Sequence, residues 1–165
     1  MADTLVLQDV SPSGIEIDQT KYMVFQESQT VKPCIGCFGC WVKIPGKCVI
    51  KDSDSEFATK LPHVGEVIVV SQLVFGGLSP NIKAIFDRSI GFILPFFCNV
   101  NGEMHHRQRY EKRPALRYML YSESMTEAEK VTATKLVQAN AINFGANSYT
   151  VDFYRSPQEA LEALK

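Results

Sequence analysis

Short apolar runs alternate along the chain with segments whose apolar residues recur at helical spacing. Five runs rich in β-branched and aromatic residues predict strands: Thr4–Gln8, Tyr22–Phe25, Glu66–Ser71, Leu116–Tyr121 and Ser148–Tyr154. The run Glu66–Ser71 is apolar almost throughout, which is typical of a strand buried on both faces of a parallel sheet. Strands that alternate with helices predict an α/β fold, with about five strands in a single domain over residues 1–165.

Helix signals stand between and after these strands. Ser79–Pro80 suits the N-cap and the first position of a helix, which apolar spacing extends to about Gly91. The capping-box sequence Thr126–Glu129 opens a long helix that we expect to end at Gly145. Ser156–Glu159 repeats the same signals and predicts a short last helix.

Two segments depart from the regular alternation. Residues 95–113, with Asn99, Asn101, Gly102 and many basic groups, predict a long polar excursion before the fourth strand. Only Ile15–Lys21 separates the turn sequence Ser11–Gly14 from the second strand, whereas a helical crossover usually needs about ten to twelve residues or more. We therefore expect the first helix to be missing or reduced to a turn. The alternation of Ile15–Ile17 leaves open a hairpin with the first strand.

Four cysteines carry the densest chemistry in the sequence. They follow the pattern C-x2-C-x2-C-x7-C at Cys34, Cys37, Cys40 and Cys48, and we call Cys34–Cys48 the cysteine segment. Four thiolates suit an iron–sulfur cluster or a zinc ion. Cysteine is also among the most buried residue types, so free or buried thiols stay a third possibility. Cys98 lies outside the motif, and we expect it to be a buried thiol.

Composition excludes some classes of partner. The chain of 165 residues has a formal net charge of -1, without the concentration of Lys and Arg that nucleic-acid binding requires. Its longest apolar stretch, Ile90–Phe97, is too short to span a membrane and contains a proline. Met1–Thr4 lacks the start of a signal peptide, so we expect a cytoplasmic protein. In that reducing compartment clustered cysteines favour metal binding or catalysis over disulfides.

Two other features bear on chemistry and contacts. His105–His106, beside Arg107 and Arg109, could bind an anion, donate protons or ligate a metal. Adjacent histidines in a polar stretch are more often solvated surface, and we prefer that interpretation. The run Phe92–Phe97 exceeds what one helix face needs, which predicts a subunit interface and a homodimer or higher homo-oligomer.

The stretch Pro33–Trp41, with Gly46–Asp52, resembles the cysteine segment of flavodoxin-like NAD(P)H-dependent FMN reductases, and especially of iron–sulfur flavoproteins. Phe75–Ser79, followed by Lys83 and Phe86–Arg88, is similar to the family's loop and helix after the third strand. The resemblance covers most of the chain from about Lys32. It implies a flavodoxin-like three-layer sandwich with a five-stranded parallel sheet in the order 2-1-3-4-5, and a flavin at the carboxyl ends of the strands.

The resemblance also implies site residues. For FMN they are Ser11, Leu73, Val74, Phe75, Gly76 and Gly77. The four motif cysteines would hold a 4Fe-4S cluster near the edge that binds the flavin. Zinc is the less favoured alternative to the cluster. Glycines at 76 and 77 allow close approach to a ring or phosphate, or simply form a tight turn. The pair Asp87–Arg88 is implied to be structural, at a helix or subunit contact.

The chain departs from the family in two places. Ser11–Gly14 is the only candidate for the phosphate loop, and the helix that should follow it is absent from the pattern. Gln72 and Val74 stand where the family commonly has a proline and an aromatic residue. The expected function is a flavodoxin-like oxidoreductase in electron transfer, with a small-molecule or protein electron donor or acceptor. The alternative is a non-catalytic metal- or redox-sensing protein that has lost FMN binding.

Overall fold

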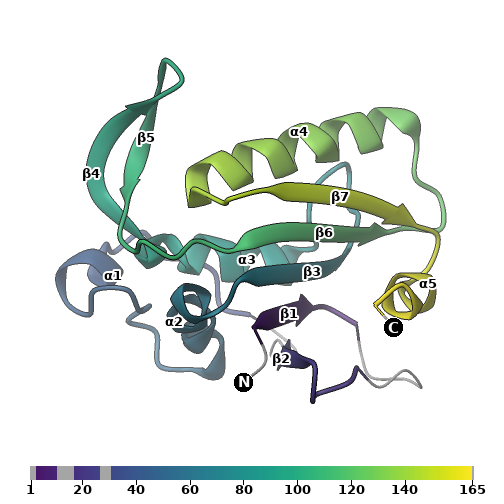
Figure 1. Cartoon of the computed structure of the whole chain (residues 1–165), viewed down its shortest axis with the longest axis horizontal. Helices are drawn as coiled ribbons and strands as arrows, with labels where there is room; N and C mark the ends of the chain where they lie inside the picture. The colour runs from purple at the N-terminus through teal and green to yellow at the C-terminus, as the bar shows by residue number, and fades with distance from the viewer. Residues whose placement is uncertain (1–2, 11–16, 27–30, 165) are drawn as a thin grey trace.

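The computed structural model describes residues 3–10, 17–26 and 31–164 (Figure 1). Its central sheet has five strands: β1 (Thr4–Gln8), β2 (Tyr22–Gln26), β3 (Glu66–Gln72), β6 (Ala115–Tyr121) and β7 (Tyr149–Tyr154). They lie in the order β2-β1-β3-β6-β7, and each neighbouring pair is parallel. Counted within this sheet the order is 2-1-3-4-5, so the predicted flavodoxin-like arrangement is confirmed.

The alternating side chains of the strands face two layers of helices. On one face, strand residues such as Leu5, Val69 and Tyr118 pack with the helices α2 (Phe57–Lys60), α3 (Pro80–Arg88) and α4 (Glu127–Phe144). On the other face, Val6, Ile68, Val70 and Met119 pack with residues of the helix α5 (Pro157–Glu162) and with Leu164 after it. Burial of both strand faces explains why the run Glu66–Ser71 is apolar almost throughout.

The connection from β1 to β2 is short, as expected. Its described residues contain no helix, only a turn at Gln19–Lys21 in which Asp18 accepts a hydrogen bond from the backbone N–H of Thr20 at 2.9 Å. Ser11–Glu16 lies outside the described ranges. Both edges of β1 are already paired in parallel, with β2 and β3, so the hairpin alternative for this strand is wrong.

Local capping explains where the last two helices begin. Thr126 accepts from the backbone N–H of Glu129, and the Glu129 carboxylate accepts from the N–H of Thr126, so the capping box is complete. Gly145 ends α4 with φ 60°, a left-handed conformation that glycine adopts without penalty. Ser156 caps α5 by accepting from Glu159. These predicted boundaries are confirmed, whereas α3 ends at Arg88, before a 3-10 turn, η3 (Ile90–Phe92).

The excursion expected at residues 95–113 contains two strands that the sequence pattern did not predict. An antiparallel hairpin of β4 (Ile93–Val100) and β5 (Glu103–Gln108) projects from the body of the molecule (Figure 1). Its turn is Asn101–Gly102, with φ 54° and 89°, and Asn-Gly favours a two-residue hairpin turn. The sequence pattern did not reveal these two strands, because neither face of the hairpin is fully buried and no regular alternation of apolar and polar residues results.

Short helices replace a single crossover helix between β2 and β3. They are α1 (Gly39–Val42), α2, and the 3-10 turns η1 (Ser53–Glu56) and η2 (Leu61–His63). The short helix α1 lies inside the cysteine segment. In the part of the chain that the structure describes, no helix combines the length and the apolar character needed to cross a lipid bilayer.

Candidate functional site

All four motif cysteines line one cavity of about 100 Å³, which we call the cysteine cavity. Cys34 and Cys37 are exposed, whereas Cys40 and Cys48 are half-buried. Apolar side chains such as Ile35, Val49 and Ile90 line the rest of the cavity, together with Asp87 and Arg88 from the end of α3. Among the described residues no three His, Cys, Asp or Glu side chains are arranged as a metal-ligand set. The backbone thus gathers the four thiols around one space without bringing their sulfur atoms together.

Two glycines let the backbone turn tightly around the cavity. Gly36 has φ +64°, in the left-handed region that L side chains rarely adopt. A Cβ atom added at Gly39 would collide with the side chain of Val49, so only glycine allows these two stretches to approach each other. Glycine therefore precedes both Cys37 and Cys40 in the motif. Position 36 needs a left-handed backbone, and position 39 has no room for a side chain.

A buried arginine forms part of the cavity wall. The Arg88 side chain is 1% exposed, and its Nη2 donates to Oδ1 of Asp52 at 2.5 Å. Nη1 donates to the carbonyl oxygen of Lys32 at 3.3 Å and lies 3.9 Å from Oδ2 of Asp54. Cys48 lines the same cavity and interacts electrostatically with Arg88. Burial opposes its positive charge, but Asp52 and Cys48 outweigh that effect and raise the pKa of Arg88.

Asp87 and Arg88, which the resemblance implies to be structural, contact different parts of the molecule. Asp87 pairs with Lys83 on the exposed face of α3, with Nζ 2.5 and 2.6 Å from its two carboxylate oxygens. Arg88 turns toward the cysteine segment. Sequence reasoning missed this position for Arg88, although Asp52, four residues after Cys48, is an acidic partner within the same motif.

Cys40 is the motif cysteine whose ionisation the structure changes most clearly. Burial raises the pKa of its thiol, and the nearby charges of Cys48, Cys34 and Cys37 raise it further. A cation bound among the four sulfurs would remove this mutual repulsion. Metal binding at this site should therefore release protons, Cys40's among them.

An aromatic stack joins the cysteine segment to the hairpin. Phe38 and Trp41 are stacked with ring centroids 5.5 Å apart, Trp41 lies 5.2 Å from His106, and His106 lies 4.7 Å from Phe97. The indole Nε1 of Trp41 donates to the carbonyl oxygens of Ile90 and Ile93, at 3.1 and 2.9 Å. The base of the hairpin is thereby fixed to α1.

The histidine pair is not solvated surface, so the preferred interpretation of His105–His106 is wrong. His106 stands between two aromatic rings, and its Nδ1 is buried. The His105 side chain is 11% exposed and lies between Glu103 and Asn143, with ring nitrogens 3.1 and 3.0 Å from their oxygens.

Cys98, expected to be buried, is half-buried on the hairpin opposite His105.

The residues implied to bind FMN form a tight turn after β3. Leu73 is buried and donates its N–H to the carbonyl of Tyr121 at 2.8 Å. Val74 and Gly77 exchange backbone hydrogen bonds of 3.0 and 2.8 Å, and Phe75 at the tip is 92% exposed. Gly76 has φ +77° and packs against α4, where a Cβ atom would lie 2.9 Å from that of Thr132. Ser11 lies outside the described residues.

Asp9 organises the carboxyl ends of three strands. Its Oδ2 accepts from the N–H of Gln72 at 3.0 Å and from the hydroxyl of Ser71 at 3.4 Å. Its Oδ1 accepts from the hydroxyl of Tyr121 at 2.9 Å. Sequence reasoning did not single out Asp9; its position directly after an apolar strand was the available signal.

The comparisons with known proteins bear on this arrangement. No family model matches the chain. The iron–sulfur flavoprotein MJ1083 of Methanocaldococcus jannaschii is 36% identical over 92 residues, which cover 53% of this chain and 45% of that protein. An iron–sulfur flavoprotein of Methanosarcina thermophila is 31% identical over 84 residues, covering 51% of this chain and 41% of the relative. About half of this chain is thus similar in sequence to parts of two iron–sulfur flavoproteins. The match spans about half the length of these curated relatives or slightly less.

A solved structure shows the fold over a longer span. The NAD(P)H:quinone oxidoreductase from Methanothermobacter marburgensis superposes with a TM-score of 0.59, covering 99% of this chain and 96% of that one. Its sequence is only 9% identical, so this likeness concerns the fold alone. Together these findings confirm the resemblance drawn from the cysteine segment and from the loop and helix after the third strand.

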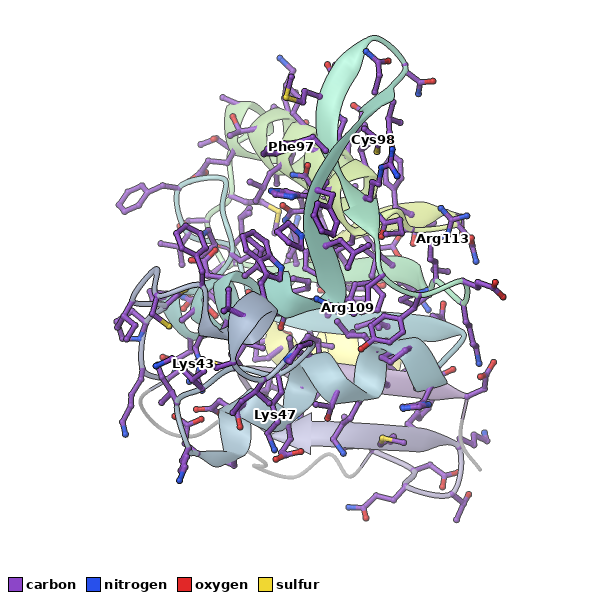
Figure 2. The ribbon with its side chains drawn as sticks, turned by 90° about the vertical axis from the view of Figure 1, so that its left-hand side faces the viewer. Lys43, Lys47, Phe97, Cys98, Arg109 and Arg113 are labelled. Carbon is purple, nitrogen blue, oxygen red and sulfur yellow. The ribbon has the colours of Figure 1, made fainter. Side chains whose placement is uncertain are left out.

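The cysteine cavity does not lie at the edge that the resemblance assigns to the flavin. The helix α3 leads from the loop after β3 to Arg88 in the cavity wall, a distance of roughly 13 Å for its 9 residues. In Figure 1, α1 and the hairpin lie at the left, whereas the arrows of β6 and β7 point to the right. Figure 2 shows Lys43 and Lys47 of the cysteine segment on the same face as Phe97 of the hairpin. The cysteines therefore do not lie near the carboxyl edge of the sheet, where we expected them.

The two candidate sites differ in how well they suit their groups. Four soft thiolate donors around one glycine-lined cavity suit an iron–sulfur cluster or zinc in their chemistry. At the carboxyl edge, the N–H groups of Gln72, Leu73, Val74 and Gly77 already have acceptors. The carboxylate of Asp9 also places negative charge there, which opposes a phosphate. The described residues of this edge do not fit the phosphate of FMN.

Proposed function

We propose that this chain is a flavodoxin-like electron-transfer protein of the oxidoreductase type, whose cysteine segment binds an iron–sulfur cluster. The observation that carries the proposal is the convergence of all four motif cysteines on one cavity. The names of the two sequence relatives, both iron–sulfur flavoproteins, support the same chemistry. A small molecule such as NAD(P)H, or a protein such as a ferredoxin, would be the electron donor or acceptor.

In this proposal Cys34, Cys37, Cys40 and Cys48 hold the cluster. Cys34 and Cys37 are exposed, and binding of the cluster would require their side chains to turn toward the half-buried pair. When bound, the cluster supplies one-electron transfer. The chain contributes the apolar lining that limits access of water, and the tight turns that fix the positions of the ligands.

A second candidate function is a metal- or redox-sensing protein without FMN. The arrangement at Asp9 favours it, because backbone donors near the end of β1 are occupied by a carboxylate and by other backbone groups. Zinc would suit this candidate as well as iron, since four thiolates bind either. Oxidation of the exposed thiols of Cys34 and Cys37 would then be the signal.

One preparation separates these functions. The protein is purified and reconstituted without oxygen, and iron, acid-labile sulfide, zinc and bound flavin are measured, followed by a fluorescence titration with FMN. Iron and sulfide in the protein support the electron-transfer proposal, with or without tightly bound FMN. Zinc alone, with no FMN affinity even in excess flavin, supports the sensing protein. A chain that takes up neither metal nor flavin would exclude both candidates.

A further inference from the structure

A single arginine supplies the positive charge in the wall of the cysteine cavity. Among the residues that line this cavity in the described part of the chain, the other charged side chain is the exposed Asp87, which pairs with Lys83. The Arg88 side chain is 1% exposed, so water screens its charge weakly. Its guanidinium binds Asp52, and its side chain lines the same cavity as Cys48, with which it interacts electrostatically. Its Nε is buried and makes no hydrogen bond.

We infer that Arg88 is a positioning residue that acts through Cys48 and raises the reduction potential of a metal centre bound by the four cysteines. The inference rests on the proposed function. Reduction adds an electron to a centre that is already surrounded by thiolates, so it increases the local negative charge. A buried guanidinium in the wall of the same cavity stabilises that added charge by its own positive charge.

A structural role for Arg88 has to be distinguished from this electrostatic one. Its contacts to Asp52 and to the carbonyl of Lys32 also join α3 to the cysteine segment. Two substitutions break the same ion pair but change the charge of the cavity in opposite directions. Arg88→Gln removes a positive charge, whereas Asp52→Asn removes a negative one and leaves Arg88 in place beside Asp54.

The matched control lies on the same helix. Lys83→Gln also removes one positive charge from α3, but Lys83 does not line the cavity, and its exposed charge is screened by water more strongly than that of Arg88. Circular dichroism and thermal unfolding of each variant establish that it is folded. The reduction potential of the reconstituted centre is then measured by a redox titration monitored by its visible absorption.

We expect the potential to fall in Arg88→Gln, to rise in Asp52→Asn, and to change least in Lys83→Gln, because both Lys83 and its partner Asp87 are exposed. Shifts of Arg88→Gln and Asp52→Asn in the same direction would mean that the ion pair matters only structurally, and would overturn the inference. An unchanged potential in Arg88→Gln would overturn it equally.

Cobalt tests Arg88 independently of any iron–sulfur cluster. Co²⁺ bound by thiolates gives a charge-transfer absorption, so its affinity for the four cysteines is measurable in protein that holds no iron. Arg88→Gln should bind Co²⁺ about tenfold more weakly than the wild type, the size typical of losing a group that orients a metal ligand, whereas Asp52→Asn and Lys83→Gln should not weaken binding. Equal affinities in all four proteins would contradict the inference.

The two proposals can fail separately. Wild-type protein that binds Co²⁺ but accepts no iron–sulfur cluster would overturn the proposed function, while the cobalt comparison would still decide the role of Arg88. Wild-type protein that binds neither would overturn both.

Discussion

At the scale of single residues, the cysteine segment depends on a buried ion pair as much as on its thiols. Arg88 comes from the end of α3, and Asp52 follows the last motif cysteine, so the pair links two segments that are far apart in sequence. Burial disfavours the charged form of each partner, but each stabilises the other. The net result is a lowered pKa for Asp52.

This lowered pKa predicts a dependence of stability on pH. Asp52 contributes stability that is fully present above its ordinary pKa of 3.8 and is lost as the pH falls through its lower pKa in the folded protein. The free energy of unfolding, measured by urea denaturation, should therefore decrease below about pH 4. In Asp52→Asn this decrease should be smaller, because the titrating carboxyl is gone.

The exposed Asp18 provides a control for the loss of stability at low pH. Its pKa is also lowered, by hydrogen bonds from Thr20, but it lies on the surface in a turn. Asp18→Asn should leave most of the acid dependence in place. If Asp52→Asn and the wild type lost stability in parallel as the pH fell from about 5 to about 3, the ion pair would not contribute to folding.

At the scale of secondary-structure elements, Trp41 is the main connection between α1 and the hairpin. Its indole N–H is shared by two carbonyl oxygens at the base of β4, and its ring lies between Phe38 and His106. The tip of the hairpin projects beyond the body of the molecule, as Figure 1 shows, so its position depends on contacts at the base.

Trp41→Phe should loosen the hairpin while keeping an aromatic ring in the stack. Loss of the indole N–H leaves the carbonyls of Ile90 and Ile93 without this donor, at a cost of about 1–2 kcal/mol. Relative to the wild type, amide hydrogen exchange should accelerate in β4 and β5 and change little in the central sheet. Phe97→Leu, which changes the outer end of the same stack, is the comparison, and it should have the smaller effect on β4. Uniform changes across the sheet would contradict this account of the hairpin.

The sequence predicted those elements whose signals lie within a few neighbouring residues. The strands and the capping box at Thr126 were predictable because apolar periodicity and hydrogen bonds within three residues determine them. The hairpin was missed because its strands are only partly buried, although Asn101–Gly102 signalled the turn. The position of Arg88 and the bridging role of Asp9 depend on contacts between distant segments, which spacing along the chain does not encode.

At the scale of the whole molecule, exposed apolar side chains gather where the cysteine segment meets the hairpin. Phe38 and Phe97, the two ends of the aromatic stack, are 60% and 58% exposed, and Phe96 is 63% exposed. Figure 2 shows this face with Phe97 and Cys98 on the hairpin. Surface of this kind on a globular domain commonly marks a contact with another protein.

We propose that this face pairs two copies of the chain, in agreement with the homo-oligomer expected from the run Phe92–Phe97. Size-exclusion chromatography with light scattering should give a dimer or a larger assembly at micromolar concentration. Phe97→Glu should shift the protein toward monomer, because a charge would be buried in the contact. The control is Phe75→Glu, at the exposed tip of the loop after β3, which should leave the assembly intact. A wild-type monomer across this range would exclude the contact.

The central claim is that the four motif cysteines together hold a metal centre. Its most direct test is the content of iron and acid-labile sulfide in protein reconstituted without oxygen, compared among the wild type, Cys48→Ser and Cys98→Ser. The account predicts iron and sulfide in the wild type and in Cys98→Ser, and a large loss of both in Cys48→Ser. Equal iron and sulfide in Cys48→Ser and the wild type, or none in the wild type, would contradict it.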